Sequence, residues 1–220
     1  MSTKGYILLG LSFLFIIWFW SACQIEELPD KFEDDLTATA YQPQPYDLNL
    51  PDWLPIPVIP EDNPLTVEGV ALGRYLFYDP LLSSDNTMSC FSCHKQEKGF
   101  TSGTAFSTGV LGESTHRSSM SLTNLVFYPD RFSWDGRAQS IEEIVSVAVE
   151  LPVELNESWP NVLEKLRNSE RYPPLFRKAF GIESRDEITE ELTAKAIGQF
   201  VRTLVSGQAR FDRVVWLNDG

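Results

Sequence analysis

The pentapeptide Cys90-Phe91-Ser92-Cys93-His94 decides which fold and chemistry this chain is expected to have. C-x-x-C-H is the attachment signature of a c-type haem. Two thiols at this spacing reach the two vinyl groups of one porphyrin, and the imidazole that follows becomes the proximal ligand of the iron. The motif therefore predicts Cys90 and Cys93 as thioether anchors, His94 as an iron ligand, and one covalent haem c per chain.

Two other uses of the same residues remain open. A structural zinc site needs four nitrogen or sulfur ligands. Outside the motif the chain offers only Cys23 and His116, and Cys93 and His94 are too close together to chelate comfortably. A redox-active disulfide between Cys90 and Cys93 would be expected beside a βαβ pattern, and the sequence shows none. The haem is the hypothesis that gives all three residues of the motif a separate role.

The first 22 residues indicate export from the cytoplasm. After Lys4 comes an apolar run, Gly5 to Trp20, and then Ser21-Ala22-Cys23, a pattern typical of a signal peptide. It resembles a bacterial lipoprotein signal with Cys23 as the lipidated residue, although Trp20 is not the usual aliphatic residue there. An uncleaved anchor helix is the alternative, because the apolar run is just long enough to cross a bilayer. Both predict a periplasmic or cell-envelope protein, attached to the membrane through its N-terminus.

Composition and charge exclude some partners. The chain has 220 residues, 43% of them hydrophobic, which is enough for the core of one or two small domains. The formal net charge is −13, so nucleic acid is a poor partner. An acidic surface could steer a basic electron-donor protein or serve only solubility.

Residues 23–60 are expected to form an acidic, proline-rich disordered tether. Residues 24–60 contain seven of the 14 prolines and show neither a helical nor a strand period. The end of this segment, Leu50 to Pro60, could lie against the following domain as an extended arm.

The remainder, residues 61–220, predicts a mainly α domain with long irregular loops. Thr66 can cap a helix that ends near Phe77. Ser140 begins a capping box, and Thr189 caps a third helix with acids in its first turn. Shorter helices are expected at 161–168 and at 174–180, the latter ended by Gly181. The order of these elements around the motif favours a cytochrome c-like haem domain in which the first and last helices cross.

Three of these helices have a recognisable apolar stripe. In the helix after Ser140 it is Ile141, Ile144, Val145 and Ala148. In the first helix, Gly73 would permit the close approach of a neighbour. The expected stripe there is Val67, Val70, Ala71 and Tyr75, and in the helix after Thr189 it is Ala194, Ile197, Phe200, Val201 and Leu204.

From Asp62 to Asp219 the sequence resembles the bacterial di-haem cytochrome c peroxidase family, which includes the enzymes that mature methylamine dehydrogenase. Only the N-terminal haem domain of that family is matched. The tryptophan block in its order after C-x-x-C-H is the most specific part. The matching blocks are Asp62-Asn63-Pro64, Leu72 to Pro80, Leu82-Ser83, Ser89 to His94, Ser119 to Asn124, Trp134 to Ala138, Pro152-Val153-Glu154 and Arg210 to Arg213.

The resemblance implies reduction of hydrogen peroxide to water, with electrons from a small redox protein such as a cytochrome c or a copper protein. It implies that Glu154 moves a proton in the distal pocket and that Trp134 relays electrons between two haems. It also implies a calcium ligand at Asn124, and haem propionate contacts at Arg117 and Arg137. From the residues alone, the glutamate could be a solvated acid, the tryptophan a core residue and the asparagine a local turn.

The sequence also departs from the family pattern. Val110 stands where the peroxidases carry a second, removable histidine ligand, so the iron is expected to be open without prior activation. His116 is expected near the haem edge or on the surface, and Met120 in the core.

The largest departure is that the family's second haem domain is absent, since the sequence has no second C-x-x-C-H and stops at Gly220. Either the chain is part of a longer protein, or a separate protein supplies the electrons. Two main function classes follow. A peroxidase needs an open, high-spin iron, whereas a single-haem electron-transfer cytochrome needs two strong axial ligands. A haem-based sensor is a third class.

Overall fold

The computed structural model describes residues 35–217. The signal-like segment, Cys23 and the start of the expected tether lie outside the described residues. Within 35–217, no helix is both long and apolar enough to cross a membrane.

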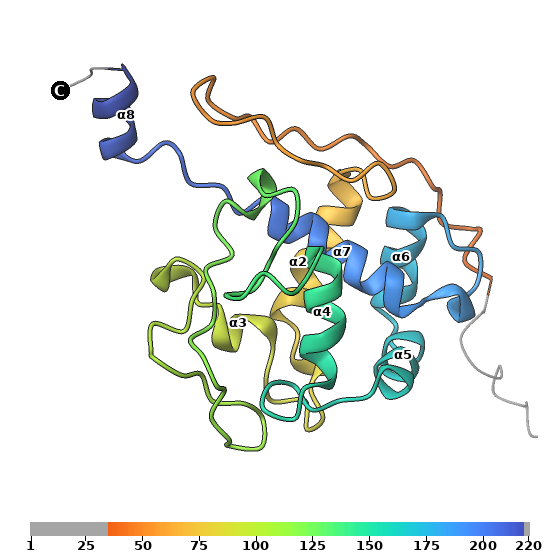
Figure 1. Ribbon diagram of the computed structural model, residues 1–220. Helices are drawn as coiled ribbons and strands as arrows, with labels where there is room; N and C mark the ends of the chain where they lie inside the picture. The colour runs from red at the N-terminus through yellow and green to blue at the C-terminus, as the bar shows by residue number, and fades with distance from the viewer. Residues whose placement is uncertain (1–34, 218–220) are drawn as a thin grey trace, which may run out of the picture. The chain divides into compact units, whose positions relative to one another are not determined.

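The described chain is helical, as the sequence predicts, with isolated bridges in place of strands (Figure 1). The long stretch between α3 and α4 contains short 3-10 turns and isolated bridges. The α-helices are α2 (Val67–Tyr78), α3 (Cys90–Cys93), α4 (Ile141–Glu150), α5 (Trp159–Arg167), α6 (Tyr172–Phe180), α7 (Glu190–Arg202) and α8 (Arg210–Leu217), and the 3-10 helices are η1 (Pro80–Leu82), η2 (Gln96–Lys98), η3 (Leu125–Phe127) and η4 (Arg185–Glu187).

The three predicted N-caps are confirmed. The side chains of Thr66, Ser140 and Thr189 each accept a hydrogen bond from the backbone N–H three residues further on, at 3.0–3.2 Å. The capping box at Ser140 differs in one half, because the Glu143 carboxylate accepts from the N–H of Gln139 (2.7 Å). These side chains pair backbone donors that the helices leave free at their first turns.

The two shorter helices begin earlier than expected, at Trp159 and Tyr172. Each has a proline in its first turn, where a missing N–H breaks no helical hydrogen bond. Gly181 ends α6 as predicted, in the left-handed conformation (φ 78°).

Helix α2 packs directly against α7, with α4 also on α7 and α6 also on α2 (Figure 1). The stripe expected for α2 is wrong except at Val70, since Val67 and Tyr75 are about half exposed. Glycine decides which face is buried. A Cβ at Gly73 would overlap the carbonyl oxygen of Ala196, so only a bare backbone lets the two helices approach this closely. The buried face of α2 is Gly69, Val70, Leu72, Gly73, Leu76 and Phe77.

We expect Gly73→Ala to destabilise the domain by about 1–3 kcal/mol, the usual cost of overpacking a core. Alanine favours helix by about 1 kcal/mol over glycine, but the clash is with backbone, which cannot rotate away. Chemical denaturation measures the difference. Ala71→Val is the control, because it adds bulk on the exposed side of the same helix. A Gly73→Ala variant as stable as the parent would disprove the close contact.

The buried face of α7 agrees with the expected stripe except at Leu204, which lies beyond the end of the helix and is half-buried. This face also contains polar side chains. Arg202, 4% exposed, donates to both carboxylate oxygens of Glu142 on α4 (2.6 and 2.9 Å). Burial acts to raise the pKa of Glu142, but the hydrogen bonds and charge of Arg202 outweigh it and the pKa is lowered. The bidentate pair fixes α4 on α7.

Residues 35–60 are an arm that packs along the domain, so the described part of the expected tether is not free. Leu36 is buried, and its N–H and that of Val58 donate to backbone oxygens of the domain (2.9 and 2.7 Å). The indole N–H of Trp53 donates to the carbonyl oxygen of Gly207 (3.0 Å). Composition predicts an unstructured segment here because these backbone contacts leave no periodic pattern in the sequence.

Candidate functional site

The two cysteines of the C-x-x-C-H motif lie on the single turn of α3, and both are free thiols. At the start of α3, the hydroxyl of Ser92 accepts a hydrogen bond from the N–H of the N-cap residue Ser89 (3.0 Å). His94 is the C-cap, and its N–H donates to the carbonyl oxygen of Cys90 (3.0 Å). The fold thus presents both thiols and the imidazole from one continuous turn.

The His94 ring is oriented by a hydrogen bond from Nδ1 to the carbonyl oxygen of Phe100 (2.8 Å). That carbonyl is placed by a tight turn in which Phe100 has a positive φ of 56°. Burial lowers the pKa of His94, against the opposing effect of the backbone oxygens of Phe100 and Met120. A neutral imidazole whose Nδ1–H is engaged presents Nε2 as an acceptor, which is the arrangement of a metal-ligating histidine.

The structure brings Glu154 to this motif from 60 positions further along the chain. Burial raises the pKa of its carboxyl group, and the charge of Arg137 opposes this shift. Burial also raises the pKa of the Cys90 thiol to about 12, and the negative charge of Glu154 adds to that shift. Glu154 likewise contributes to the raised pKa of Cys93, after burial. Glu154 is therefore a half-buried acid beside the two thiols and not a solvated one.

Gly109 lets the loop that follows the motif lie directly on the backbone of Glu154. A Cβ at Gly109 would overlap the carbonyl group of Val153, and the N–H of Val110 donates to the carbonyl oxygen of Glu154 (2.8 Å). Thr108, in the same loop, has its carbonyl oxygen 4.0 Å from Sγ of Cys93. Val110 is thus next to Glu154, in the loop that approaches Cys93.

Trp134 is on the surface, with 64% of its area exposed, and is not a core residue. Its indole N–H donates to the carbonyl oxygen of Ser118 (2.7 Å). The tryptophan block forms a tight loop between Phe132 and Ala138, whose backbones are paired (2.8 and 3.3 Å). The indole is held in place while its ring stays open to contact.

The two arginines predicted near the haem meet on one carboxylate. Arg117 and Arg137 each donate to Oδ2 of Asp135, at 2.8 and 3.3 Å. The hydrogen bond from the Arg117 guanidinium is the largest cause of the lowered pKa of Asp135. Both guanidinium groups are more than half exposed, so they retain donors for a further anionic group. Asp135 is part of the tryptophan block but received no role from the sequence, because its contact with Arg117 joins positions 18 residues apart.

Asn124 has its side chain engaged with the backbone after α7. Its Nδ2 donates to the carbonyl oxygen of Ser206 (2.9 Å), and its Oδ1 accepts from the N–H of Ser206 (2.8 Å).

His116 is exposed, as expected. Within residues 35–217, no three or more His, Cys, Asp or Glu side chains gather where they could hold a metal ion.

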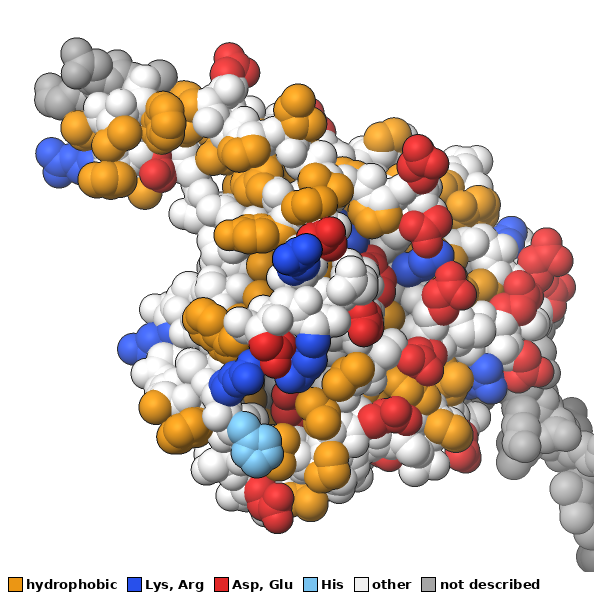
Figure 2. Space-filling view, viewed as in Figure 1, with side chains coloured by type: hydrophobic (Ala, Val, Ile, Leu, Met, Phe, Trp, Pro, Cys, Tyr) orange, Lys and Arg blue, Asp and Glu red, His pale blue; other side chains and the backbone are white. Residues whose placement is uncertain are grey.

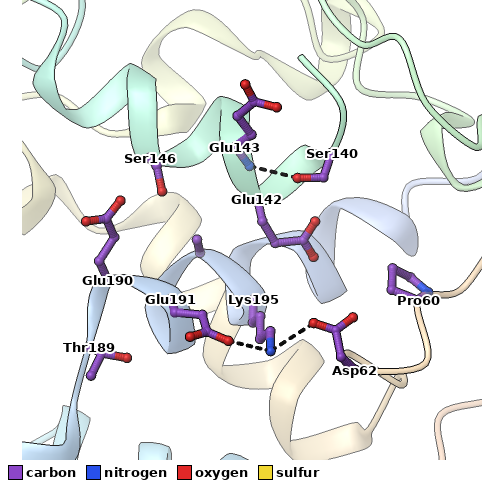
Figure 3. A pocket seen from close by; sticks show the side chains of 11 residues that line it. Pro60, Asp62, Ser140, Glu142, Glu143, Ser146, Thr189, Glu190, Glu191 and Lys195 are labelled. Atoms are coloured by element: carbon purple, nitrogen blue, oxygen red, sulfur yellow. Dashed lines mark hydrogen bonds and ion pairs between the residues drawn. The ribbon is translucent and has the colours of Figure 1, made fainter.

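A hollow of about 560 Å³ lies elsewhere, between α4 and the start of α7 (Figure 3). In Figure 3, Lys195 points between Asp62 and Glu191, which it contacts at 3.1 and 2.7 Å. Glu142 and Ser140 also line it, but none of the predicted site residues does. This hollow is therefore separate from the candidate site.

The donor set fits a covalent haem. Two free thiols on one turn, a neutral imidazole with Nδ1 fixed, and apolar side chains at the edge of the core, among them Phe91 and Met120, are what such a group requires. A helical domain with this site belongs to the class of c-type haem proteins.

The comparisons identify the family. The model of the di-haem cytochrome c peroxidase family matches residues 67–219, and the chain belongs to that family, whose members carry covalent haem c. The methylamine utilization protein MauG of Methylorubrum extorquens is 41% identical over 154 residues, which are 70% of this chain and 43% of that protein. The cytochrome c peroxidase Ccp of Escherichia coli is 33% identical over 164 residues, 74% of this chain and 34% of that protein.

Solved structures agree with the fold. A MauG-like protein associated with microbial copper homeostasis superposes with a TM-score of 0.73 at 29% identity, covering 80% of this chain and 51% of that one. The di-haem peroxidase BthA of Burkholderia thailandensis superposes with a TM-score of 0.64 at 22% identity, covering 72% and 44%. The chain spans about half, or less, of the length of the relatives it matches.

Proposed function

We propose that this domain reduces hydrogen peroxide as the peroxide-reacting haem domain of a c-type haem peroxidase. The observation that carries the proposal is the place of Glu154, whose backbone oxygen accepts from the N–H of Val110 (2.8 Å) in the loop that approaches Sγ of Cys93. Its carboxyl group is half-buried, and burial raises its pKa. An acid with this environment next to a haem-binding motif is suited to proton transfer.

Each residue of the candidate site has a separate role in the proposal. Cys90 and Cys93 would hold the haem covalently and His94 Nε2 would ligate its iron; when bound, the haem supplies the redox-active metal. Reduction of hydrogen peroxide to two water molecules takes up two electrons and two protons. The carboxylate of Glu154 accepts the proton of one peroxide oxygen and returns it to the oxygen that leaves. The electrons come from a small redox protein, such as a cytochrome c or a copper protein.

Two observations favour a peroxidase over an electron carrier. A carrier needs a second strong iron ligand, but Val110 stands at the family's second histidine position and His116 is exposed. Met120 packs against the core, and its backbone oxygen is close to the His94 ring. In the proposal, none of Val110, His116 and Met120 would serve as a second strong ligand of the iron.

The absorption spectrum of the ferric, haem-loaded protein tests the function. We expect a high-spin spectrum that shifts within seconds of adding a stoichiometric amount of hydrogen peroxide, because nothing has to leave the iron first. A low-spin spectrum that ignores peroxide would overturn the proposal. The single-haem electron-transfer cytochrome would then be the better explanation.

The finer expectations remain part of the proposal. Arg117 and Arg137 would contact the propionates of the one covalent haem proposed for this domain. Trp134, exposed and fixed, would pass electrons to that haem from a second haem domain on the same or another chain. Asn124 would add a calcium ligand through the free lone pair of its Oδ1. We propose the periplasm or cell envelope as the location, with the membrane reached through a lipid on Cys23 or an N-terminal anchor helix.

A further inference from the structure

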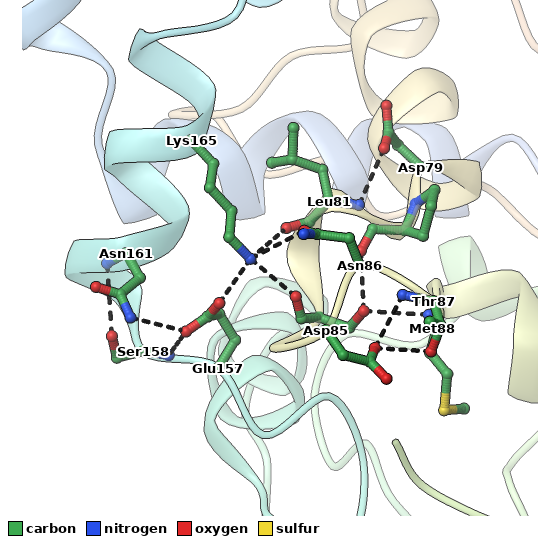
Figure 4. A network of polar contacts seen from close by, with 12 residues as sticks. Asp79, Leu81, Asp85, Asn86, Thr87, Met88, Glu157, Ser158, Asn161 and Lys165 are labelled. Atoms are coloured by element: carbon green, nitrogen blue, oxygen red, sulfur yellow. Dashed lines mark hydrogen bonds and ion pairs between the residues drawn. The ribbon is translucent and has the colours of Figure 1, made fainter. Parts of the chain in front are cut away.

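A largely buried lysine, Lys165, joins three parts of the chain (Figure 4). Nζ of Lys165, on α5, contacts the carbonyl oxygens of Leu81 and Ser83 at 3.2 and 2.9 Å and Oδ1 of Asn86 at 3.0 Å. It also forms a 2.6 Å ion pair with Oε2 of Glu157. Figure 4 shows the ammonium group surrounded by these oxygens, so its three donors are fully used.

Glu157 is as well satisfied as its partner. It is 9% exposed, and its second oxygen accepts from the N–H of Ser158 (2.8 Å) and from Nδ2 of Asn161 (3.1 Å). Burial acts to raise the pKa of Glu157, but the hydrogen bond from Lys165 and the other donors outweigh it, and the pKa is lowered. The carboxylate is therefore charged and fixed.

The network joins the two segments that flank the halves of the candidate site in the sequence. Asn86 precedes Cys90 by one short loop, and Glu157 follows Glu154 by three residues. The same two segments are also joined directly, since the N–H of Ser84 donates to the carbonyl oxygen of Leu155 (3.1 Å). Lys165 thus fixes the segment that carries Glu154 against the loop that leads into the motif.

A buried ion pair contributes little net stability compared with an apolar pair of similar size. What it contributes here is geometry, because an apolar side chain at position 165 could not hold two carbonyl oxygens and a carboxylate at fixed directions. Glu154 is held from the other side by the Gly109 loop, through the Val110 hydrogen bond. The segment around Glu154 therefore has a fixed support on each side.

We infer that Lys165 and Glu157 are positioning residues, which hold the Glu154 carboxyl group at its working place beside Cys90 and Cys93. The inference rests on the proposed function only for the consequence on peroxide, whereas the positioning itself is a property of the fold. A misplacement of about 1 Å can cost a catalysed reaction about 100-fold.

Hydrogen exchange of the haem-loaded protein tests the positioning without reference to activity. In Lys165→Met we expect the amides of Ser84 and Val110 to exchange at least about tenfold faster, while amides of α7 are unchanged, because only the local support is lost. Lys195→Met is the matched control and should leave both amides unchanged. Lys195 is also a largely buried lysine, but its carboxylate partners are Asp62 and Glu191, outside the Lys165 network. Unchanged exchange at Ser84 and Val110 would overturn the inference, whatever the protein does with peroxide.

The rate constant of the reaction with hydrogen peroxide then tests whether Lys165 acts through Glu154. We expect Lys165→Met to lower it about 10- to 100-fold when Glu154 is present, and to have no further effect in a Glu154→Gln background. An equal loss in both backgrounds would overturn the inference, because Lys165 would then act on the whole domain.

A second variant, Glu157→Gln, provides the test if Lys165→Met does not fold. Glu157→Gln keeps the volume and the carbonyl contacts of Lys165, and we expect it to show the same pattern with a smaller loss. If Glu154→Gln alone leaves the peroxide rate unchanged, the proposed function fails, and the exchange of Ser84 and Val110 still decides the positioning.

Discussion

The double variant Cys90→Ala/Cys93→Ala is expected to lose all covalently bound haem. Both thiols are free and lie on the one turn of α3, where two thioether bonds to one porphyrin can form. Without them, His94 alone would hold the group through its iron. Denaturation followed by extraction with acidified organic solvent should then release every haem, whereas the parent protein should retain its haem through the same treatment.

Cys23→Ala is the matched control for this experiment. It removes the remaining cysteine of the chain and leaves the motif intact, so covalent haem should persist while any lipid on Cys23 is lost. Haem that stays with the double variant through denaturation would contradict the assignment of the two thiols.

The helices of this domain were predictable because their signals are local. Thr66, Ser140 and Thr189 cap helices through contacts that span only three residues. The face of α2 was not predictable from its apolar residues, because the contact that selects it is the backbone of Ala196 against Gly73. Hydrophobic periodicity describes which side chains prefer burial, but it contains no term for how closely two backbones can approach.

The candidate site also has one part that local sequence predicts and another that depends on long-range contacts. The motif at Cys90 is a local pattern, and sequence alone assigns it. The place of Glu154 was implied by the family resemblance, while from single residues it could equally have been a solvated acid. Its support by Lys165 and Gly109 left no pattern at all, because each contact joins segments that are far apart in the sequence.

Glu154→Gln is expected to slow the reaction with hydrogen peroxide by about two to four orders of magnitude, the range of general acid–base catalysis. Glutamine keeps the size of the side chain and cannot accept and return the proton. Stopped-flow measurement of the second-order rate constant gives the comparison. Glu150→Gln is the control, because Glu150 is an exposed acid at the end of α4, and it should leave the rate unchanged.

The pH dependence of the rate constant separates loss of the Glu154 carboxylate from misfolding of the variant. The reaction needs the carboxylate form of Glu154, and burial raises its pKa above the ordinary value, against the opposing charge of Arg137. The rate constant of the parent should therefore fall as the pH falls through that raised pKa, while an ordinary exposed carboxyl group would still be ionised. Glu154→Gln should show no such fall. A parent rate that is flat with pH in this range, or a variant as fast as the parent, would remove Glu154 from the mechanism.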